Sequence, residues 1–221
     1  TSYHGAGAIK AVPEEIKNRG FKKAFVASDP DLVKFGVSKK VTDLLEAAGI
    51  EYTLYSDIKP NPTIENVKHG VEEFKASGAE CIVAIGGGSP IDAAKAMWIK
   101  YEYPELTFED MCKVFGIPKL RRKAHFCAIS STSGTATEVT AFSIITDCHK
   151  GIKYPIADFE ITPDVAIVDP ELAHTMPQKL VAHTGMDAMT HAVEAYVSTA
   201  NCDYTDPLAI HAIEMIMNDL I

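Results

Sequence analysis

The sequence has few features of a membrane, secreted or nucleic-acid-binding protein. Its 221 residues include a single tryptophan, and aromatic residues make up 8% of the chain. No apolar run reaches the roughly 20 residues that span a bilayer, and no signal-peptide pattern opens the sequence. The formal net charge is −9, whereas proteins that bind phosphate backbones need clustered lysine and arginine. We therefore expect neither a membrane nor a nucleic acid as a partner.

Paired cysteines are also missing. Five cysteines are spread along the chain, and no two of them have the spacing of a zinc finger or a redox-active pair. Cys81 and Cys127 lie within apolar runs, which is typical of small core residues. An odd number of unpaired cysteines favours a reducing compartment. We therefore expect a cytoplasmic protein.

The apolar residues that are present predict an alternation of strands and helices. Apolar runs predict strands at 23–27, 51–55, 81–85 and 126–129, and helical spacing predicts helices at 31–48, 63–77 and 89–100. The run at 81–85 is continuous, as in a strand that is buried on both faces. This order of elements indicates a parallel sheet with helices on both sides.

The last third of the chain has a different pattern. Short strands are predicted at 143–146, 152–156 and 165–168. Helices are predicted from Pro177 onward, and Pro207 opens or kinks one of them. We therefore predict an α/β fold, with a parallel-sheet domain at 1–172 followed by the start of an all-helical domain at 173–221.

The strongest local signal is the glycine-rich turn Gly86-Gly87-Gly88-Ser89-Pro90, between a predicted buried strand and a predicted helix. Glycines let backbone N–H groups approach an anion closely, and a helix N-terminus adds partial positive charge. Ser89 can cap the helix and also donate to a phosphate. Ligands of open α/β sheets bind at the carboxyl ends of strands, so the turn predicts a nucleotide site. The alternative is an ordinary turn, since the common G-x-G-x-x-G fingerprint is absent.

Two further segments follow predicted strands and carry polar side chains. Residues 130–138 (SSTSGTATE) can hydrogen-bond phosphate, ribose or an amide, or can form a helix N-terminus with a Thr135–Glu138 capping box. Asp29 follows the first predicted strand, where a carboxylate can bind ribose hydroxyls and repel a 2′-phosphate. The alternative is that Asp29 caps the helix after it.

A possible metal pair lies in the segment Gly185-Met186-Asp187-Ala188-Met189-Thr190-His191, which is expected to begin a helix. Asp187 and His191 are four residues apart, so they project from one helix face. A carboxylate and an imidazole suit a divalent metal, but an exposed Asp–His hydrogen bond explains the spacing as well. Gly185 is expected to interrupt the helix after His183, which we do not count as a ligand.

Several segments together resemble the iron-containing (group III) alcohol dehydrogenase family. They are AIGGGSPIDAAK at 84–95, STSGTATEVT at 131–140 and GMDAMTHAVEAYVS at 185–198, with KPNPT at 59–63 and PDVAIVDPEL at 163–172. Such motifs in order and spaced across nearly the whole chain are much more specific than one motif alone. The resemblance implies a dinucleotide-binding domain at 1–172 and, at 173–221, the start of a helical metal-binding domain, with the active site in the cleft between them.

The resemblance also implies a set of cofactor and metal ligands. Asp29 matches the residue that favours NAD over NADP. The other matched nucleotide contacts are Asn61, Gly87, Gly88, Ser89, Thr132, Thr135 and Lys153. Asp187 and His191 match the first two ligands of a divalent metal held by one aspartate and three histidines, with iron expected and zinc as the alternative. The remaining two histidines lie on later helices in the family, so we expect the chain to be a truncated portion of a longer enzyme.

The expected activity is a metal-assisted hydride transfer between NAD and a primary alcohol or its aldehyde. The metal acts as a Lewis acid, the cofactor does the redox chemistry, and no side chain stands out as the general base. The expected partners are a small alcohol or aldehyde and a second copy of the chain in a homodimer. The alternatives are a zinc-type glycerol dehydrogenase, a dehydroquinate-synthase-like enzyme, and a nucleotide-binding fragment without catalysis.

Overall fold

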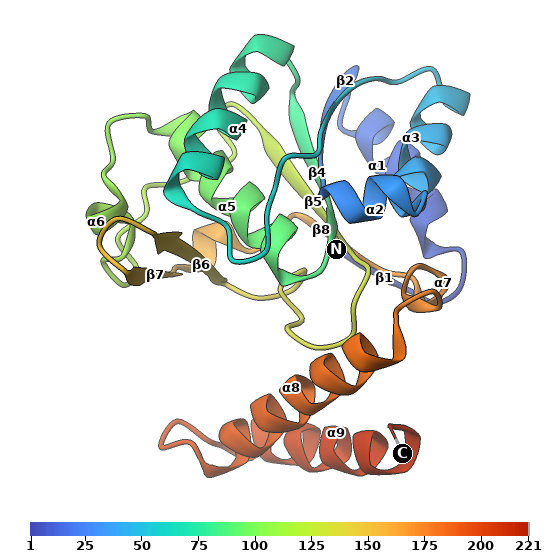
Figure 1. The fold of residues 1–221 in the computed structure, drawn as a ribbon, viewed down its shortest axis with the longest axis vertical. Helices are drawn as coiled ribbons and strands as arrows, with labels where there is room; N and C mark the ends of the chain where they lie inside the picture. Colours follow the sequence, from blue (N-terminus) through green and yellow to red (C-terminus); the bar gives the residue numbers. More distant parts are fainter. Residues whose placement is uncertain (221) are drawn as a thin grey trace. The chain divides into compact units, whose positions relative to one another are not determined.

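The structure, a computed structural model, describes residues 1–220. A six-stranded sheet has the order β1-β8-β5-β4-β2-β3, and each neighbouring pair is parallel (Figure 1). Its strands are β1 (Ser2–His4), β2 (Lys23–Ala27), β3 (Glu51–Tyr55), β4 (Cys81–Gly86), β5 (His125–Ser130) and β8 (Val165–Val168). The predicted α/β fold with a parallel sheet is therefore confirmed.

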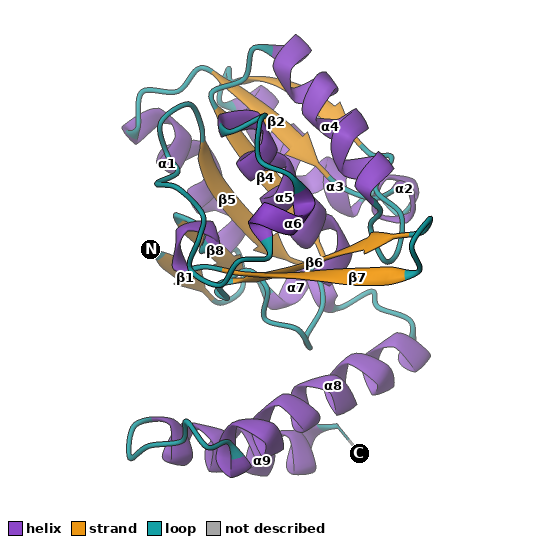
Figure 2. Ribbon diagram, turned by 90° about the vertical axis from the view of Figure 1, so that its left-hand side faces the viewer, coloured by secondary structure: helices purple, strands orange, loops and turns teal. Residues whose placement is uncertain are grey.

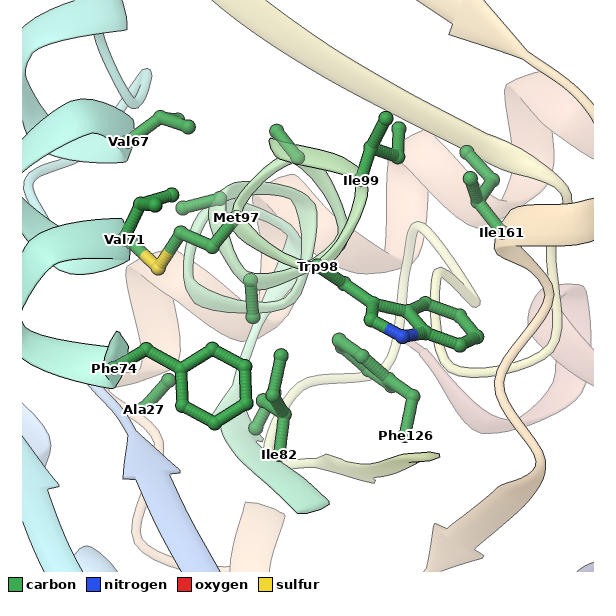
Figure 3. Close-up of a cluster of buried hydrophobic side chains, with 14 of the residues drawn as sticks. Ala27, Val67, Val71, Phe74, Ile82, Met97, Trp98, Ile99, Phe126 and Ile161 are labelled. Carbon is green, nitrogen blue, oxygen red and sulfur yellow. The ribbon is translucent and has the colours of Figure 1, made fainter. Parts of the chain in front are cut away.

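Helices cover both faces of this sheet, so that it has two hydrophobic cores. The long helices are α4 (Ile64–Ser77) and α5 (Gly88–Glu102) on one face, and α1 (Ala11–Asn18) and α3 (Val37–Ala47) on the other (Figure 1). Alternate residues of a strand point to opposite faces, so Ile82 of β4 joins the core under α4 and α5, while Val83 joins the other. Figure 3 shows the first of these cores, where Trp98 and Phe126 have ring centroids 5.4 Å apart.

The remaining elements are short or lie outside the sheet. The short helices are η1 (Ala8–Lys10), α2 (Pro30–Lys34), α6 (Phe108–Met111), η2 (Phe159–Ile161) and α7 (Pro170–Ala173). Strands β6 (Phe142–Asp147) and β7 (Ile152–Ala157) form a separate antiparallel pair beside α5 and α6 (Figure 2). The predicted strands at 143–146 and 152–156 are therefore present, and they form a hairpin of their own.

The chain divides into two compact units. The first comprises residues 1–131 and 136–172, and the second comprises residues 132–135 together with the chain from Ala173 onward. The second unit consists mainly of α8 (Gln178–Val197) and α9 (Thr205–Asp219), which pack against each other. Pro207 lies in the first turn of α9, as predicted. In the described part of the chain, no helix has the length and apolar content needed to cross a bilayer.

Three local predictions are wrong. The helix predicted at 31–48 is divided into α2 and α3, because Gly36 between them has a left-handed backbone with φ of 74°. Residues 131–141 form neither helix nor strand, so the capping box predicted for Thr135 and Glu138 has no helix to cap. Gly185 does not interrupt α8. A Cβ there would lie 2.4 Å from Leu220 Cδ1, so Gly185 allows close packing of α8 against the end of the chain's last helix.

A buried carboxylate stabilises the loop that enters β5. The Glu102 carboxylate at the end of α5 accepts a hydrogen bond from the Trp98 indole N–H at 3.1 Å. It also accepts hydrogen bonds from two consecutive backbone N–H groups, that of Arg121 at 2.9 Å and that of Arg122 at 3.0 Å. Glu102 is 5% exposed. Buried backbone N–H groups need an acceptor, so this one side chain replaces the hydrogen bonds that regular secondary structure would supply.

Replacing Glu102 by glutamine should destabilise the fold by about 2 kcal/mol or more, because the amide turns hydrogens toward backbone N–H groups that then lack a charged acceptor. The measurement is urea unfolding of E102Q and of E105Q, since Glu105 is exposed on the loop that follows α5. The midpoint should fall for E102Q and stay unchanged for E105Q. Equal midpoints for the two variants would show that the buried carboxylate contributes nothing specific.

Candidate functional site

The glycine-rich turn and Asp29 follow strands that end at the carboxyl edge of the parallel sheet. Strands β4 and β5 end side by side, since Gly86 pairs with Ser130. The Ser131 N–H donates to the Gly86 carbonyl at 2.9 Å, which ties together the loops that follow the two strands. Strand β2 pairs with the other side of β4, so Asp29, two residues beyond β2, follows a strand that ends at the same edge.

The glycine-rich turn forms the start of α5. Gly87 is the N-cap residue, and among residues 1–220 no side chain caps this helix. The first backbone N–H groups of a helix have no partner within the helix, so this N-terminus can donate to an anion. The prediction that Ser89 caps α5 is wrong: the helix begins at Gly88, and the Ser89 hydroxyl oxygen instead accepts a hydrogen bond from the Asn61 N–H at 3.2 Å.

Gly86 has a separate, structural reason to be glycine. A Cβ at this position would lie 2.5 Å from Pro90 Cγ and 2.8 Å from Pro90 Cβ. The proline ring cannot turn away as a flexible side chain would. Gly86 therefore permits the close approach of Pro90, in the first turn of α5, to the end of β4. This contact would require glycine at position 86 whether or not a nucleotide binds.

Asn61 and Lys153 belong to segments that are connected to the glycine-rich turn. Asn61 has a left-handed backbone with φ of 53° and contacts Ser89 as described above. The next residue, Pro62, accepts a hydrogen bond from the Thr146 N–H at 2.8 Å. Thr146 is paired with Lys153 across the β6–β7 hairpin. Two hydrogen bonds, the Asn61–Pro62 peptide bond and the pairing of β6 with β7 thus connect Ser89 to the exposed Lys153.

Asp29 is the N-cap of α2. Its Oδ1 accepts a hydrogen bond from the Leu32 N–H at 2.8 Å, so the helix-cap interpretation is confirmed. Partial burial raises the pKa of the Asp29 carboxyl, and hydrogen bonds from the backbone of Leu32 and Asp31 oppose that rise. The cap fixes the carboxylate at the end of β2, which is compatible with a second role toward a ribose.

The second unit contains the other predicted site residues. Thr132 and Thr135 flank Gly134, where a Cβ would lie 2.9 Å from Thr184 Cβ and 3.0 Å from the Thr184 carbonyl oxygen of α8. This contact explains the glycine in the serine- and threonine-rich loop. It places Thr132 and Thr135 on a short segment that packs against α8.

Asp187 and His191 lie on consecutive turns in the middle of α8. His191 Nε2 is 3.6 Å from Asp187 Oδ1, and the side chains are 59% and 44% exposed. A carboxylate and an imidazole in this arrangement are donors that divalent iron or zinc accepts, so the pair fits two positions of a metal site. Within residues 1–220 no group of three histidine, cysteine, aspartate or glutamate side chains is placed to hold a metal ion.

Sequence reasoning overlooked two residues of α5, Asp92 and Lys95. Lys95 is completely buried, and its ammonium donates to the carbonyl oxygen of Thr137, near the end of the serine- and threonine-rich loop, and to those of Thr140 and Phe142 after it. The available signal was the position of a lysine in the apolar run Ala93-Ala94-Lys95-Ala96-Met97, because lysine is seldom buried unless it is paired.

Comparison with known proteins decides the family. The sequence model described as "Iron-containing alcohol dehydrogenase" matches residues 1–170. The chain belongs to this family. A second model, for the C-terminal region of the Fe-containing alcohol dehydrogenase family, matches residues 181–221. The resemblance inferred from the motifs is therefore confirmed.

Individual relatives agree with this assignment. The chain is 56% identical to an NADPH-dependent butanol dehydrogenase of Clostridium saccharobutylicum, over 99% of the chain and 55% of the relative. A crystal structure of 1,3-propanediol oxidoreductase superimposes with a TM-score of 0.94 at 35% identity, over 100% of the chain and 57% of that protein. Sulfoacetaldehyde reductase from Bifidobacterium kashiwanohense, solved in complex with NAD⁺, gives a TM-score of 0.90 at 28% identity, over 100% and 57%. The chain thus spans a little over half the length of these proteins.

Proposed function

We propose that the protein transfers a hydride between a nicotinamide cofactor and a small primary alcohol or its aldehyde, with the help of a divalent metal. The observation that carries the proposal is the α5 N-terminus, without a capping side chain among the described residues and opened by glycines, at the carboxyl end of β4. This is the place where α/β sheets bind dinucleotides. The family match over residues 1–170 favours an alcohol dehydrogenase over the glycerol dehydrogenase and dehydroquinate-synthase-like alternatives.

The residues of the first unit bind and orient the cofactor. Backbone N–H groups of Gly87, Gly88 and Ser89 donate to the pyrophosphate, and Asn61 holds the Ser89 hydroxyl in place through its N–H. Gly86 keeps the turn close to Pro90. Lys153 adds a cation on the neighbouring hairpin, and Thr132 and Thr135 add hydroxyls from the segment at 132–135. The nicotinamide supplies the redox chemistry when it is bound.

The metal ligands of this chain are Asp187 and His191. Two ligands are too few for a stable divalent site, where three or four protein ligands are usual. The carboxylate offsets part of the ion's charge, and the imidazole adds a nitrogen donor. The expected ion is iron, with zinc as the alternative, and it supplies Lewis acidity toward the alcohol oxygen when bound. The five cysteines are free thiols, which suits the cytoplasm.

The test of this function is an assay of alcohol-dependent NAD reduction by the full-length protein, followed at the nicotinamide absorbance. Ethanol, butanol and 1,2-propanediol give a first set of substrates with different chain lengths and substituents. We expect turnover that is lost on chelation and restored by iron or zinc. A protein that binds NAD but reduces none with any small alcohol, in the presence of metal, would leave only the nucleotide-binding alternative.

The cofactor preference rests on Asp29. A 2′-phosphate next to its carboxylate would bring two negative charges together in a half-buried position, at a cost of about 1–3 kcal/mol, or roughly tenfold to a hundredfold in affinity. We therefore propose NAD as the cofactor, although the butanol dehydrogenase relative is NADPH-dependent. The preference cannot be taken from the family as a whole, because the sulfoacetaldehyde reductase structure holds NAD⁺.

Replacing Asp29 by asparagine should reduce the preference for NAD over NADP by about tenfold or more, because the amide oxygen can still cap α2 while the negative charge is gone. Asp31→Asn is the matched control, since Asp31 is exposed in the same turn of α2. The measurement is the ratio of the two dissociation constants for each variant. The proposal fails if the unmodified protein already prefers NADP, or if both variants change the ratio equally.

A further inference from the structure

Lys95 places an ammonium group inside the first unit of the protein. The residue is completely buried. Its Nζ donates to the backbone carbonyl oxygens of Thr137 at 2.7 Å, Thr140 at 2.8 Å and Phe142 at 2.8 Å. An ammonium has three N–H donors and no acceptor. Each donor can therefore be matched by one carbonyl, and the group needs no water.

Two of the carbonyls that Lys95 binds, those of Thr137 and Thr140, belong to a segment with little structure of its own, and the third is that of Phe142 at the start of β6. Residues 131–141 form neither helix nor strand, and Ala136 has a left-handed backbone with φ of 50°. Buried carbonyls outside regular structure need donors from elsewhere. Lys95 supplies donors to this segment at three points, so the path of the segment depends strongly on that side chain.

Asp92, one turn before Lys95 on α5, holds the same segment. Its carboxylate accepts hydrogen bonds from the Thr137 hydroxyl at 2.7 Å and from the Ile144 N–H at 3.1 Å, and its backbone carbonyl accepts one from the Ser143 hydroxyl at 2.8 Å. Burial lowers the pKa of Lys95 to about 8, and the charges of Asp92 and Glu138 oppose that change. The two acidic side chains thus help to keep the buried amine protonated at neutral pH.

The helix that carries these two residues also begins with the glycine-rich turn. Gly88 is the first residue of α5, and Lys95 lies seven residues later, about two turns on. The loop at 131–138 is attached to the turn at its start, through the Ser131 N–H and the Gly86 carbonyl, and to α5 at its end, through Lys95 and Asp92. One helix therefore begins with the glycine-rich turn and also binds the chain that follows residues 132–135.

We propose that Lys95 is a positioning residue for the nucleotide site: its ammonium holds residues 137–142 against α5, so that the loop carrying Thr132 and Thr135 is ordered before the nucleotide binds. Lys95 itself touches no cofactor. This inference rests on the proposed function, because it assumes that the loop contacts a nucleotide.

The test compares two lysines of the same helix in the full-length protein. Lys100 is the matched control, because its Nζ also donates to backbone carbonyls, those of Pro104 at 2.6 Å and Leu106 at 2.5 Å, but it does so on the loop after the far end of α5. Lys95→Met and Lys100→Met each remove an ammonium and keep an unbranched side chain. Amide hydrogen exchange without nucleotide, NAD titration and steady-state kinetics are measured for both variants.

We expect K95M to accelerate amide exchange in residues 131–144 and to raise the dissociation constant for NAD by about tenfold or more. In the kinetics, the KM for NAD should rise by a larger factor than that by which kcat falls. K100M should change exchange near 103–107 and leave NAD affinity within about twofold of the original. If K95M does not fold, Thr137→Val is the second variant. It removes the hydroxyl that donates to Asp92 and accepts from Lys95, and it retains the three carbonyls that Lys95 binds, so it should give smaller changes in the same direction.

Two results would overturn the positioning role and leave the proposed function intact. One is a disordered 131–144 segment in K95M with unchanged NAD affinity. The other is an equal loss of NAD affinity in K95M and K100M, which would mark the effect as general destabilisation. A failure of the unmodified protein to bind NAD or NADP would instead overturn the proposed function, and with it the role of Lys95 in nucleotide binding. Amide hydrogen exchange would still decide whether Lys95 orders residues 131–144.

Discussion

Replacing His191 by alanine in the full-length protein is expected to remove the metal and the alcohol-dependent reduction of NAD together, while NAD affinity stays the same. Loss of a direct ligand should reduce metal affinity by more than the roughly 10–100-fold that loss of a supporting residue causes. Most of the predicted nucleotide contacts lie in the first unit, whereas His191 lies on α8 of the second. Nucleotide binding should therefore be spared.

His183→Ala is the control for this experiment. His183 lies on α8 four residues before Asp187 and is exposed, so the two variants remove the same side chain from nearby places on one helix. Elemental analysis and an NAD titration are made on both proteins. Full metal occupancy in H191A would show that Asp187 and His191 are only a surface pair, and the proposal of a metal-dependent enzyme would lose its ligands in this chain.

Replacing Gly88 by valine is expected to abolish NAD binding, with a loss of affinity of about a hundredfold or more, and to leave the fold largely intact. The valine side chain would stand where the pyrophosphate approaches the first N–H groups of α5. Its cost to a helix is below about 1 kcal/mol, since Gly88 has an ordinary negative φ. The measurements are calorimetric titration with NAD and thermal unfolding.

Gly86→Ala separates the two reasons for having glycine in this turn. Its Cβ would collide with the Pro90 ring, so this variant should lower the unfolding temperature, whereas G88V should not. NAD affinity that is unchanged in G88V would mean that the glycine-rich turn serves packing alone and that the nucleotide site lies elsewhere.

The sheet could be predicted from the sequence because its strands are buried on both faces. Every residue of β4 is buried, so its apolar run is continuous, and turns with glycine or proline mark its ends. The helix at 63–77 was equally clear, with Thr63 as its N-cap, since its apolar residues recur at helical spacing. These features depend on neighbours in the sequence, which is why a single sequence reveals them.

The errors concern residues whose environment is set by distant parts of the chain. Gly185 looks like a helix breaker, yet its lack of a side chain serves the contact with Leu220, 35 positions away. Gly36 lies in a good helical pattern, yet it takes a left-handed backbone and divides the helix. Lys95 stands in an apolar stretch of the sequence, but its carbonyl partners lie more than 40 positions away along the chain. Only the folded structure shows that the carbonyls of residues 137–142 offset the free-energy cost of removing the Lys95 ammonium from water.

The site was predicted residue by residue, and the structure brings part of it together. Asn61 and Ser89 share a hydrogen bond, although 28 positions separate them. Such contacts cannot be derived from spacing, because they depend on which strands are neighbours in the sheet. The motifs predicted the candidate residues, and the order of the strands explains how the glycine-rich turn and Asp29 come to follow strands that end at the same edge.

The most direct test of this account is a crystal structure of the full-length protein with NAD. We expect the pyrophosphate within hydrogen-bonding distance of the backbone N–H groups of Gly87–Ser89, and the adenosine ribose beside the Asp29 carboxylate. A nucleotide seated away from the carboxyl edge of the sheet, or one whose phosphates make no contact with the start of α5, would contradict the account.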